Sequence, residues 1–366
     1  MNASVARILA LAFATIPCTP RGPILAQEPA TAAPRVATRA TRPPADPSRH
    51  RSGAVVVDGV RIEYLDWGGS GPALVFLPGF GNSAHVFDTF APRFTDRYRV
   101  VGVSRVGYGG SGQPQRDGYT LAARVEQLRA VLDTLGLRRA VLAGHSLGGD
   151  EITAFATRYP ERTAGLIYLD AALDHVGALK VEAALGPLFQ YAPEPTGADL
   201  ADAAGYQGFL RRMQGVEFPL GEVLATTRFD SAGAVRGRRT PDRVVQAIVG
   251  QTAFLDYTGV RAPALALYAD KKAGDMLPFL AADSAANARA TALLDSIRPW
   301  ETGERARFAR EVPRARVVAF PSHHYQFLSH PAETERLMRE FLATVPLHTR
   351  HRSPAAPRSR RHRHLN

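Results

Sequence analysis

The sequence has a single cysteine, and it lacks both a long apolar run and a recognisable set of metal ligands. Cys18 lies near the N-terminus, so the rest of the chain has no thiol and cannot contain a disulfide framework. No group of His, Glu and Cys residues has the spacing of a metal site, and we predict that the protein binds no metal and no cofactor. The glycines at 107, 109 and 110 are not followed by the helix pattern and acidic partner that a dinucleotide-binding loop requires.

Positive charge is confined to the two ends of the chain. The formal net charge of the 366 residues is +11. Residues 1–52 carry seven Arg and two acids, residues 347–366 carry six Arg and no acid, and residues 53–346 therefore carry no net charge. A nucleic-acid-binding domain concentrates basic residues on its folded surface. We therefore predict no nucleic-acid partner.

The N-terminal residues have the pattern of an export signal. Arg7 precedes the apolar run Ile8–Ile16, which is too short to span a bilayer. We predict cleavage after Ala26, export to the periplasm or the medium, and no stable membrane span in the cleaved protein. Residues 27–52 are rich in Ala, Pro, Thr and Arg and are expected to form a disordered linker, and residues 347–366 a basic disordered tail.

Apolar runs alternate with helix-like patterns through most of the chain. Asp58-Gly59 separates two strand-like segments, which predicts a hairpin. Buried strands are then predicted at 73–77, 99–103, 140–143, 165–169, 264–268 and 316–320. This alternation predicts an α/β fold with a mostly parallel sheet flanked by helices, built from residues 53–172 and 261–346. Residues 173–260 have no strand pattern and are predicted to form an inserted helical cap.

One short motif lies between a predicted strand and a predicted helix, Gly144-His145-Ser146-Leu147-Gly148. The glycines allow backbones to pass closely at a tight turn, and Ser146 is expected at the turn, beside the N-terminus of the helix. A glycine-rich turn with an incidental serine is the alternative. The strand before the motif and the helix after it favour an exposed, reactive serine.

Polar residues follow several predicted strands, where open α/β sheets build their sites. Asp170 and Asp270 each end a strand, and His323 and His324 follow the last one. The order Ser146, then an aspartate, then His324 is the order of a hydrolase triad on this architecture. His323 is the alternative base.

Residues 54–345 resemble the α/β-hydrolase superfamily, in the branch with a cap between the sixth and seventh strands. The resemblance rests on Leu77-Pro78-Gly79-Phe80, the loop 104–109, the Ser146 motif, and His324-Tyr325-Gln326-Phe327. It implies that Ser146 is the nucleophile, that His324 is the base, and that the amides of Phe80 and Leu147 form the oxyanion hole. Two positions depart from the family, which often has His at position 78 and usually Asp at position 104.

The sequence offers three aspartates as candidates for the triad acid. In the superfamily the acid most often follows the seventh strand, which favours Asp270, but the matching acid position holds Lys272 and Asp275 lies three residues further on. Asp170 ends the sixth strand cleanly, and some branches take their acid from that strand. We predict Asp170, with Asp270 and then Asp275 as alternatives.

The resemblance implies a serine hydrolase that cleaves a carboxylic ester or related small acyl substrate through an acyl-enzyme. Hydrolysis of an amide, a lactone or a carbon–carbon bond on the same triad is an alternative. A non-catalytic ligand-binding member of the fold is another. Serine at the turn disfavours the dehalogenase and epoxide-hydrolase branches, which use aspartate there.

Overall fold

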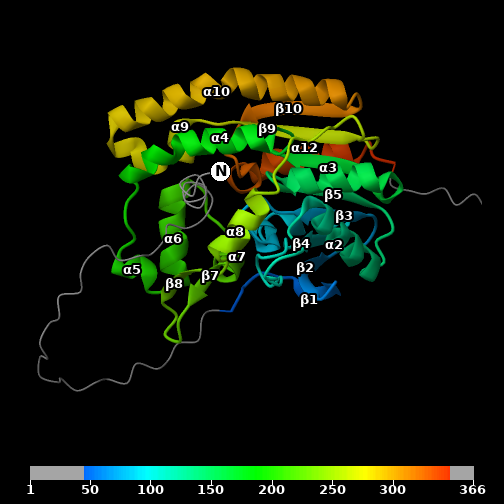
Figure 1. The fold of residues 1–366 in the computed structure, drawn as a ribbon, viewed down its shortest axis with the longest axis horizontal. Helices are drawn as coiled ribbons and strands as arrows, with labels where there is room; N and C mark the ends of the chain where they lie inside the picture. The colour runs from blue at the N-terminus through cyan, green and yellow to red at the C-terminus, as the bar shows by residue number, and fades with distance from the viewer. Residues whose placement is uncertain (1–44, 347–366) are drawn as a thin grey trace, which may run out of the picture.

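The computed structural model describes residues 45–346 (Figure 1). An eight-stranded sheet with the order β1-β2-β4-β3-β5-β6-β9-β10 forms its centre. β1 and β2 are antiparallel, β2 runs antiparallel to β4, and all later neighbours are parallel. This confirms the predicted mostly parallel α/β fold. The strands are β1 (Arg51–Val57), β2 (Val60–Gly68), β3 (Ala73–Leu77), β4 (Arg99–Val103), β5 (Ala140–His145), β6 (Thr163–Leu169), β9 (Ala264–Asp270) and β10 (Ala315–Pro321).

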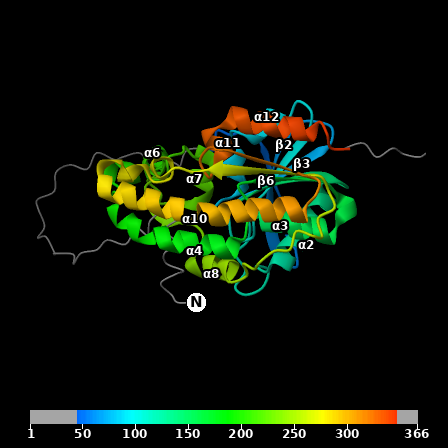
Figure 2. The same cartoon turned by 90° about the horizontal axis from the view of Figure 1, so that it is seen from above.

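Helices cover both faces of the sheet. Successive side chains along each strand point to opposite faces, so each strand contributes apolar side chains to the core on either face. In β3, Val75 faces one apolar cluster, whereas Leu74 and Phe76 face the other. The first cluster includes side chains of α2 (Leu121–Thr134), α3 (Gly148–Arg158) and α8 (Asp242–Val249). The second includes side chains of the short helices η1 (Ala84–Phe87) and η2 (Ala91–Phe94), and of α12 (Pro331–Leu342). Figure 2 shows α12 on one side of the sheet and α2 and α3 on the other.

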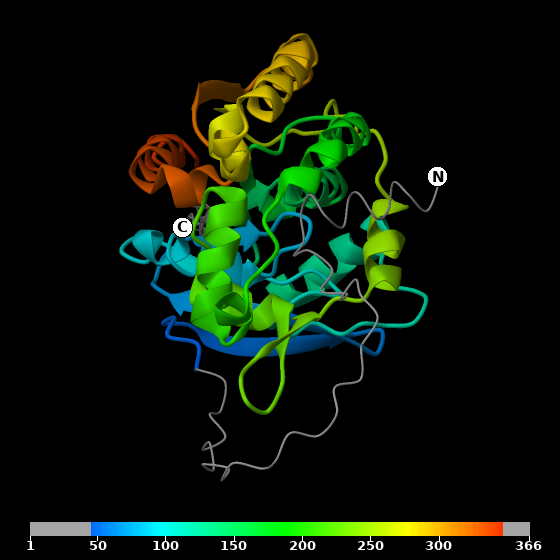
Figure 3. The same ribbon diagram turned by 90° about the vertical axis from the view of Figure 1, so that its left-hand side faces the viewer.

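Residues 173–260, between β6 and β9, form mainly helices. A two-stranded antiparallel hairpin interrupts them, which the sequence pattern did not predict. Figure 3 shows these elements gathered at one end of the sheet. They are α4 (His175–Leu185), η4 (Gly186–Tyr191), α5 (Gly197–Leu200), α6 (Ala203–Gln214), α7 (Leu220–Thr226), β7 (Thr227–Phe229), β8 (Val235–Arg238) and α8.

A second stretch, after β9, packs on this segment although the sequence placed it in the core. It contains α9 (Ala273–Met276), η5 (Pro278–Ala282) and the long helix α10 (Ser284–Glu311). Leu188 of η4 shares an apolar cluster with Leu277, Leu280 and Leu294. The periodicity of residues 273–301 does not show this, because the pattern of a surface helix is the same whether it covers a sheet or another helix. α11 (Gln326–Ser329) then precedes α12.

The end of the predicted linker belongs to the fold. β1 begins at Arg51, and Asp46 and His50 lie within ion-pair distance of side chains on and beside η1. The predicted linker therefore ends too late in the chain, because its composition hides these contacts. The predicted signal peptide, the rest of the linker and the C-terminal tail lie outside the described residues. Among residues 45–346, no helix is both long and apolar enough to cross a membrane.

Candidate active site

Ser146 occupies a strained turn between β5 and α3. Its φ is +47°, in the left-handed region that side chains other than glycine rarely adopt. The two flanking glycines are required by close contacts. A Cβ on Gly144 would lie 2.5 Å from the carbonyl oxygen of Gly148, and one on Gly148 would lie 2.6 Å from that of Leu77. The predicted tight strand–turn–helix is therefore present, and it holds the serine in one fixed backbone conformation.

His324 follows β10 and contacts the aspartate at the end of β6. Its Nδ1 lies 2.7 Å from Asp170 Oδ2. Asp170 is buried, and it also accepts hydrogen bonds from the Ala269 amide at 3.0 Å and from Lys271 Nζ at 3.0 Å. Burial alone would raise the pKa of Asp170, but Lys271, His324 and the Ala269 amide together hold it well below its usual value. The carboxylate is therefore ionised at neutral pH and can orient the imidazole.

The other two aspartates considered from the sequence have different surroundings. Asp270 is 37% exposed and accepts a hydrogen bond from Arg305 at 2.7 Å. Asp275 lies in α9 with an exposed side chain. Lys271, next to Asp270, points instead to Asp170 and to Glu301 Oε1 at 3.2 Å. The carboxylate that the structure brings to His324 is thus the one that the sequence favoured.

The loop after β3 lies against the serine turn. A Cβ on Gly79 would be 3.0 Å from Ser146 Cβ and 2.7 Å from His145 Nδ1. Phe80 is the next residue of this loop, and Leu147 immediately precedes α3. The two predicted oxyanion residues therefore belong to segments that meet at Ser146.

Sequence reasoning missed the residue that fixes this loop. Arg105 is buried and donates to the carbonyl oxygens of Gly79 at 2.9 Å and Pro78 at 2.8 Å. Its Nε donates to Glu151 at 2.5 Å, and Arg124 lies 3.2 Å from the same carboxylate. An arginine two residues after a buried strand was the available signal, since buried cations need partners.

Ser104 stands where the family usually has an aspartate, and it bonds to a carboxylate on β2 instead. Ser104 Oγ donates to Glu63 Oε2 at 2.7 Å and accepts from the Ala84 amide at 3.0 Å. Glu63 Oε2 also accepts from the Gly110 amide at 2.9 Å. A carboxylate is therefore present in this loop network, although it comes from a neighbouring strand.

Two further histidines lie beside His324, and both are held neutral. His145 Nε2 lies 3.2 Å from the carbonyl oxygen of His324, so this side chain contacts the backbone of the candidate base. Burial, with the nearby His324, lowers the pKa of His145 well below its usual value. Burial and His324 also lower the pKa of His323 to about 3, and its Nδ1 accepts from the Tyr325 amide at 3.0 Å. Of the two histidines after β10, His324 is the one whose ring nitrogen bonds to Asp170.

Ser146, Asp170 and His324 all line one cavity of about 160 Å³. Its outer wall, defined here as the lining residues of α4, η4, α6, α9 and α10, combines the two segments on either side of β9. Most of the wall is apolar: Ala178, Val181, Leu185, Phe189, Phe209, Leu210, Met213, Met276, Leu294, Ile297 and Trp300. The site can therefore enclose a small apolar group next to the serine.

One polar side chain in the cavity has a buried partner. His175, at the start of α4, lies 2.6 Å through Nδ1 from Asp150 Oδ1. Burial alone would lower the pKa of His175, but the Asp150 carboxylate raises it above its usual value. Its Nε2 is buried and has no hydrogen-bond partner among the described residues. A polar group of a substrate in the cavity could therefore form a hydrogen bond with this nitrogen.

Glu222 lies behind the oxyanion loop, and its pKa depends strongly on its buried surroundings. It accepts from Asn82 Nδ2 at 2.9 Å and from Ser83. Burial raises the pKa of Glu222 from 4.5 to about 7, although the bonds from Ser83 and Asn82 favour the charged form. Between these values the folded chain holds a proton that the unfolded chain has lost, so stability falls as the pH rises.

We expect Glu222→Gln to remove this loss of stability at high pH, because a glutamine side chain does not titrate. Between pH 5 and pH 8 the free energy of unfolding of the variant should rise relative to the original protein by about 3 kcal/mol. Chemical denaturation at both pH values measures the difference. Glu217→Gln, at an exposed site, is the matched control. An equal difference at both pH values would show that Glu222 ionises as readily in the folded chain as in the unfolded one.

Comparisons with known proteins agree with this geometry. A sequence profile of the alpha/beta hydrolase fold matches residues 72–331. The chain is 37% identical over 107 residues to a fluoroacetate dehalogenase of Burkholderia sp, covering 28% of this chain and 35% of that protein. It is 39% identical over 121 residues to a 2-hydroxy-6-oxononadienedioate/2-hydroxy-6-oxononatrienedioate hydrolase of Burkholderia vietnamiensis, covering 31% and 42%.

These matches span between a third and a half of the length of those relatives. The crystal structure of E-2-(acetamidomethylene)succinate hydrolase is similar with a TM-score of 0.60 at 19% identity, covering 80% of this chain and 99% of that one. That likeness establishes the fold. The sheet order and the profile match over most of the chain lead to one conclusion: the protein belongs to the α/β-hydrolase fold family.

Proposed function

We propose that the protein is a serine hydrolase that cleaves a carboxylic ester of a small, largely apolar acyl compound. The observation that carries the proposal is the hydrogen bond between His324 and the buried Asp170, in the cavity that Ser146 also lines from its strained turn. A serine hydroxyl needs an adjacent base to attack at neutral pH, and a base needs an acid that orients it. These three residues supply the three roles.

The reaction begins when Ser146 Oγ bonds to the ester carbonyl carbon and passes its proton to His324. The carbonyl electron pair moves to oxygen, and the amides of Phe80 and Leu147 bind the resulting anion. Each such donor is worth about 3 kcal/mol of transition-state stabilisation. The carbon–oxygen bond then breaks, and His324 returns the proton to the leaving alcohol. Water repeats the sequence on the acyl-enzyme and releases the acid.

Asp170 has two functions in this scheme. Its bond to Nδ1 fixes the imidazole tautomer, and its charge stabilises the imidazolium that forms during attack. Lys271 and the Ala269 amide keep that carboxylate ionised and in place. Arg105 holds the carbonyls of Pro78 and Gly79, so the amide of Phe80 is positioned before substrate binds.

A second candidate is hydrolysis of a carbon–carbon bond in a substrate that carries carboxylates. Two observations favour it: the similarity to the hydrolase named for two dioate compounds, and His175 in the cavity wall, whose pKa the Asp150 carboxylate raises above its usual value. The two candidates share the triad. Turnover of p-nitrophenyl esters supports the first, and turnover of a dioate ring-cleavage compound with slow ester hydrolysis supports the second.

Labelling with a fluorophosphonate probe tests whether the serine is activated. We expect stoichiometric modification of Ser146, located by peptide mass spectrometry, because only a serine with an adjacent base attacks the phosphorus. Boiled protein is the control. Absence of labelling in a folded sample would favour the non-catalytic, ligand-binding alternative.

A further inference from the structure

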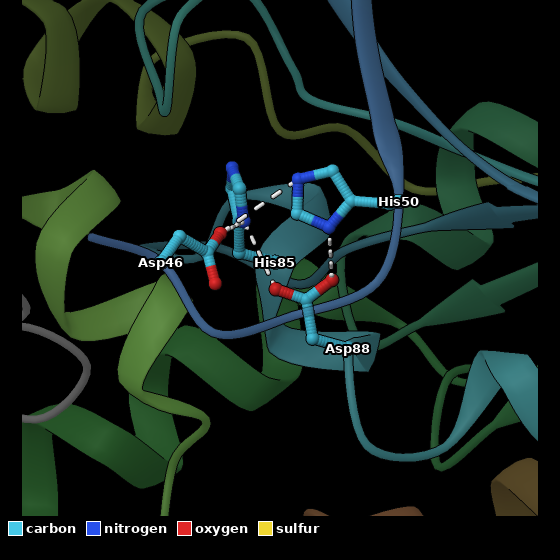
Figure 4. Close-up of side chains that lie close together, drawn as sticks. All are labelled: Asp46, His50, His85 and Asp88. Atoms are coloured by element: carbon cyan, nitrogen blue, oxygen red, sulfur yellow. Dashed lines mark hydrogen bonds and ion pairs between the residues drawn. The ribbon is translucent and has the colours of Figure 1, made fainter.

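A second cluster of ionisable side chains lies away from the catalytic cavity. Figure 4 shows Asp46 and His50, from the segment before β1, facing His85 of η1 and Asp88 directly after it. One ligand atom from each of the four residues lies within 4.8 Å of all the others. None of the four lines the catalytic cavity, so this cluster has no role in the proposed reaction.

Four ion-pair contacts connect the side chains of the cluster. His85 Nδ1 lies 3.1 Å from Asp46 Oδ2 and 3.0 Å from Asp88 Oδ2. His50 Nδ1 lies 3.2 Å from Asp88 Oδ1, and His50 Nε2 lies 3.7 Å from Asp46 Oδ2. Zinc bonds of about 2.0–2.1 Å to imidazole and carboxylate at tetrahedral angles place neighbouring ligand atoms about 3.3 Å apart. His85 Nδ1 and the two carboxylate oxygens that it contacts come close to this spacing, and His50 offers one of its two ring nitrogens as the fourth ligand.

Neighbouring groups leave the required atoms free to face that point. Trp67 Nε1 donates to Asp88 Oδ1 at 2.9 Å, and the Ser48 amide donates to Asp46 Oδ1 at 2.9 Å. These bonds hold one oxygen of each carboxylate and orient the other toward the cluster, as outer-shell partners of metal ligands do. The side chains of His50 and Asp88 are 6% and 0% exposed. Asp46 Oδ2 and His50 Nδ1 are buried, and each lies within ion-pair distance of another member of the cluster.

We propose that Asp46, His50, His85 and Asp88 form a structural site for a divalent cation of the zinc type. Two imidazoles disfavour Ca²⁺ and Mg²⁺, which prefer oxygen ligands, and two carboxylates balance a charge of +2. Four protein ligands leave no open position, as in structural rather than catalytic zinc sites. The sequence did not predict this site, because the two pairs of ligands are separated by the whole of β1, β2 and β3.

The proposed cation joins two segments through its ligands and lies beside a third. It joins the segment at residues 46–50 to η1, which follows the oxyanion loop through Asn82 and Ser83. The start of α7 lies against the same carboxylates, since a Cβ on Gly221 would be 2.6 Å from Asp88 Oδ2. The metal therefore stabilises the support behind the oxyanion loop without touching substrate.

The rival occupant of the cluster is a proton. Burial alone would lower the pKa of His85, but hydrogen bonds to Asp46 and Asp88 raise it to about 10, so in the absence of metal a protonated His85 bridges the two carboxylates. A zinc ion has to displace that proton, because an imidazole binds a metal through a deprotonated nitrogen. An ion-pair network alone would hold no zinc. The two occupants are therefore distinguishable by experiment.

The test uses the full chain purified without an affinity tag. We expect about one zinc per chain by elemental analysis after dialysis, and a Tm about 5 °C lower after exhaustive chelation, restored by zinc alone. Cobalt added to the chelated protein should give the intense visible absorption of tetrahedral Co²⁺. Asp46→Asn and His50→Gln should each lose the bound zinc and the cobalt spectrum.

Two controls exclude other histidines as the source. His330→Gln changes an exposed histidine and should retain one zinc per chain. A variant with glutamine at positions 348, 351, 362 and 364 removes the histidines of the C-terminal tail and should also retain it. Protein that holds no zinc after equilibration with excess metal, with a Tm insensitive to zinc and chelator, would overturn the proposal and identify the cluster as a proton-bridged ion-pair network. Loss of zinc only in the tail variant would overturn it equally.

Discussion

Ser146→Ala should lower turnover of p-nitrophenyl esters by about 10⁵- to 10⁶-fold and leave the fold intact. The substitution removes the only atom that bonds to the substrate carbon in the proposed reaction. Alanine keeps the Cβ that already occupies the left-handed turn at φ +47°, so the backbone strain is unchanged. Residual rate comes from the oxyanion hole and substrate binding.

Initial rates with short p-nitrophenyl esters, together with circular dichroism, measure the effect. Ser296→Ala, at an exposed position of α10, is the matched control and should retain full activity. Retention of more than a few per cent of the turnover by a folded Ser146→Ala protein would remove Ser146 from the mechanism. Because the proposed metal site lies outside the cavity, that result would leave its zinc content unaffected.

The second large effect is expected at the triad acid. Asp170→Asn should lower kcat by about 10⁴-fold, because a neutral amide no longer stabilises the imidazolium and favours the wrong tautomer of His324. The amide oxygen still accepts from Ala269, and Lys271 keeps its contact with Glu301, so the fold should survive. Asp270→Asn removes only a half-exposed ion pair with Arg305 and should leave kcat near that of the original protein.

Steady-state kinetics of these two variants, with Asp275→Asn as a third, decide the assignment. If Asp170→Asn turns over normally while Asp270→Asn does not, the acid belongs to the end of β9 and the bond seen between Asp170 and His324 is structural.

The sequence allowed the serine turn to be predicted because its signals are local. Gly144 and Gly148 are adjacent to Ser146 in the chain, and the contacts that require them involve the same strand and helix or the neighbouring β3. The position of Asp170 was also predictable, since the end of a buried strand fixes where a side chain emerges. The placement of the strands followed from their unbroken apolar runs.

Other features depend on contacts between distant segments, which a single sequence does not display. Arg105, after β4, meets the carbonyls of Pro78 and Gly79, after β3, and Lys271, after β9, meets Asp170, after β6. The packing of η4 against α9 and α10 also joins segments that are far apart in the chain. His85 and Asp88 have metal-ligand chemistry, but the spacing to His50 shows no pattern until β1–β3 fold between them.

The two-part outer wall constrains how this protein can acquire a new substrate. Leu188 and Leu294 come from opposite sides of β9 and pack in one cluster, and both segments supply lining residues. A graft of residues 173–260 from a relative would bring only part of the binding surface and would meet an unmatched α10. A change of substrate specificity in this protein therefore requires paired changes on the two sides of β9. Engineering that exchanges the inserted segment alone should fail unless residues 273–301 are transferred with it.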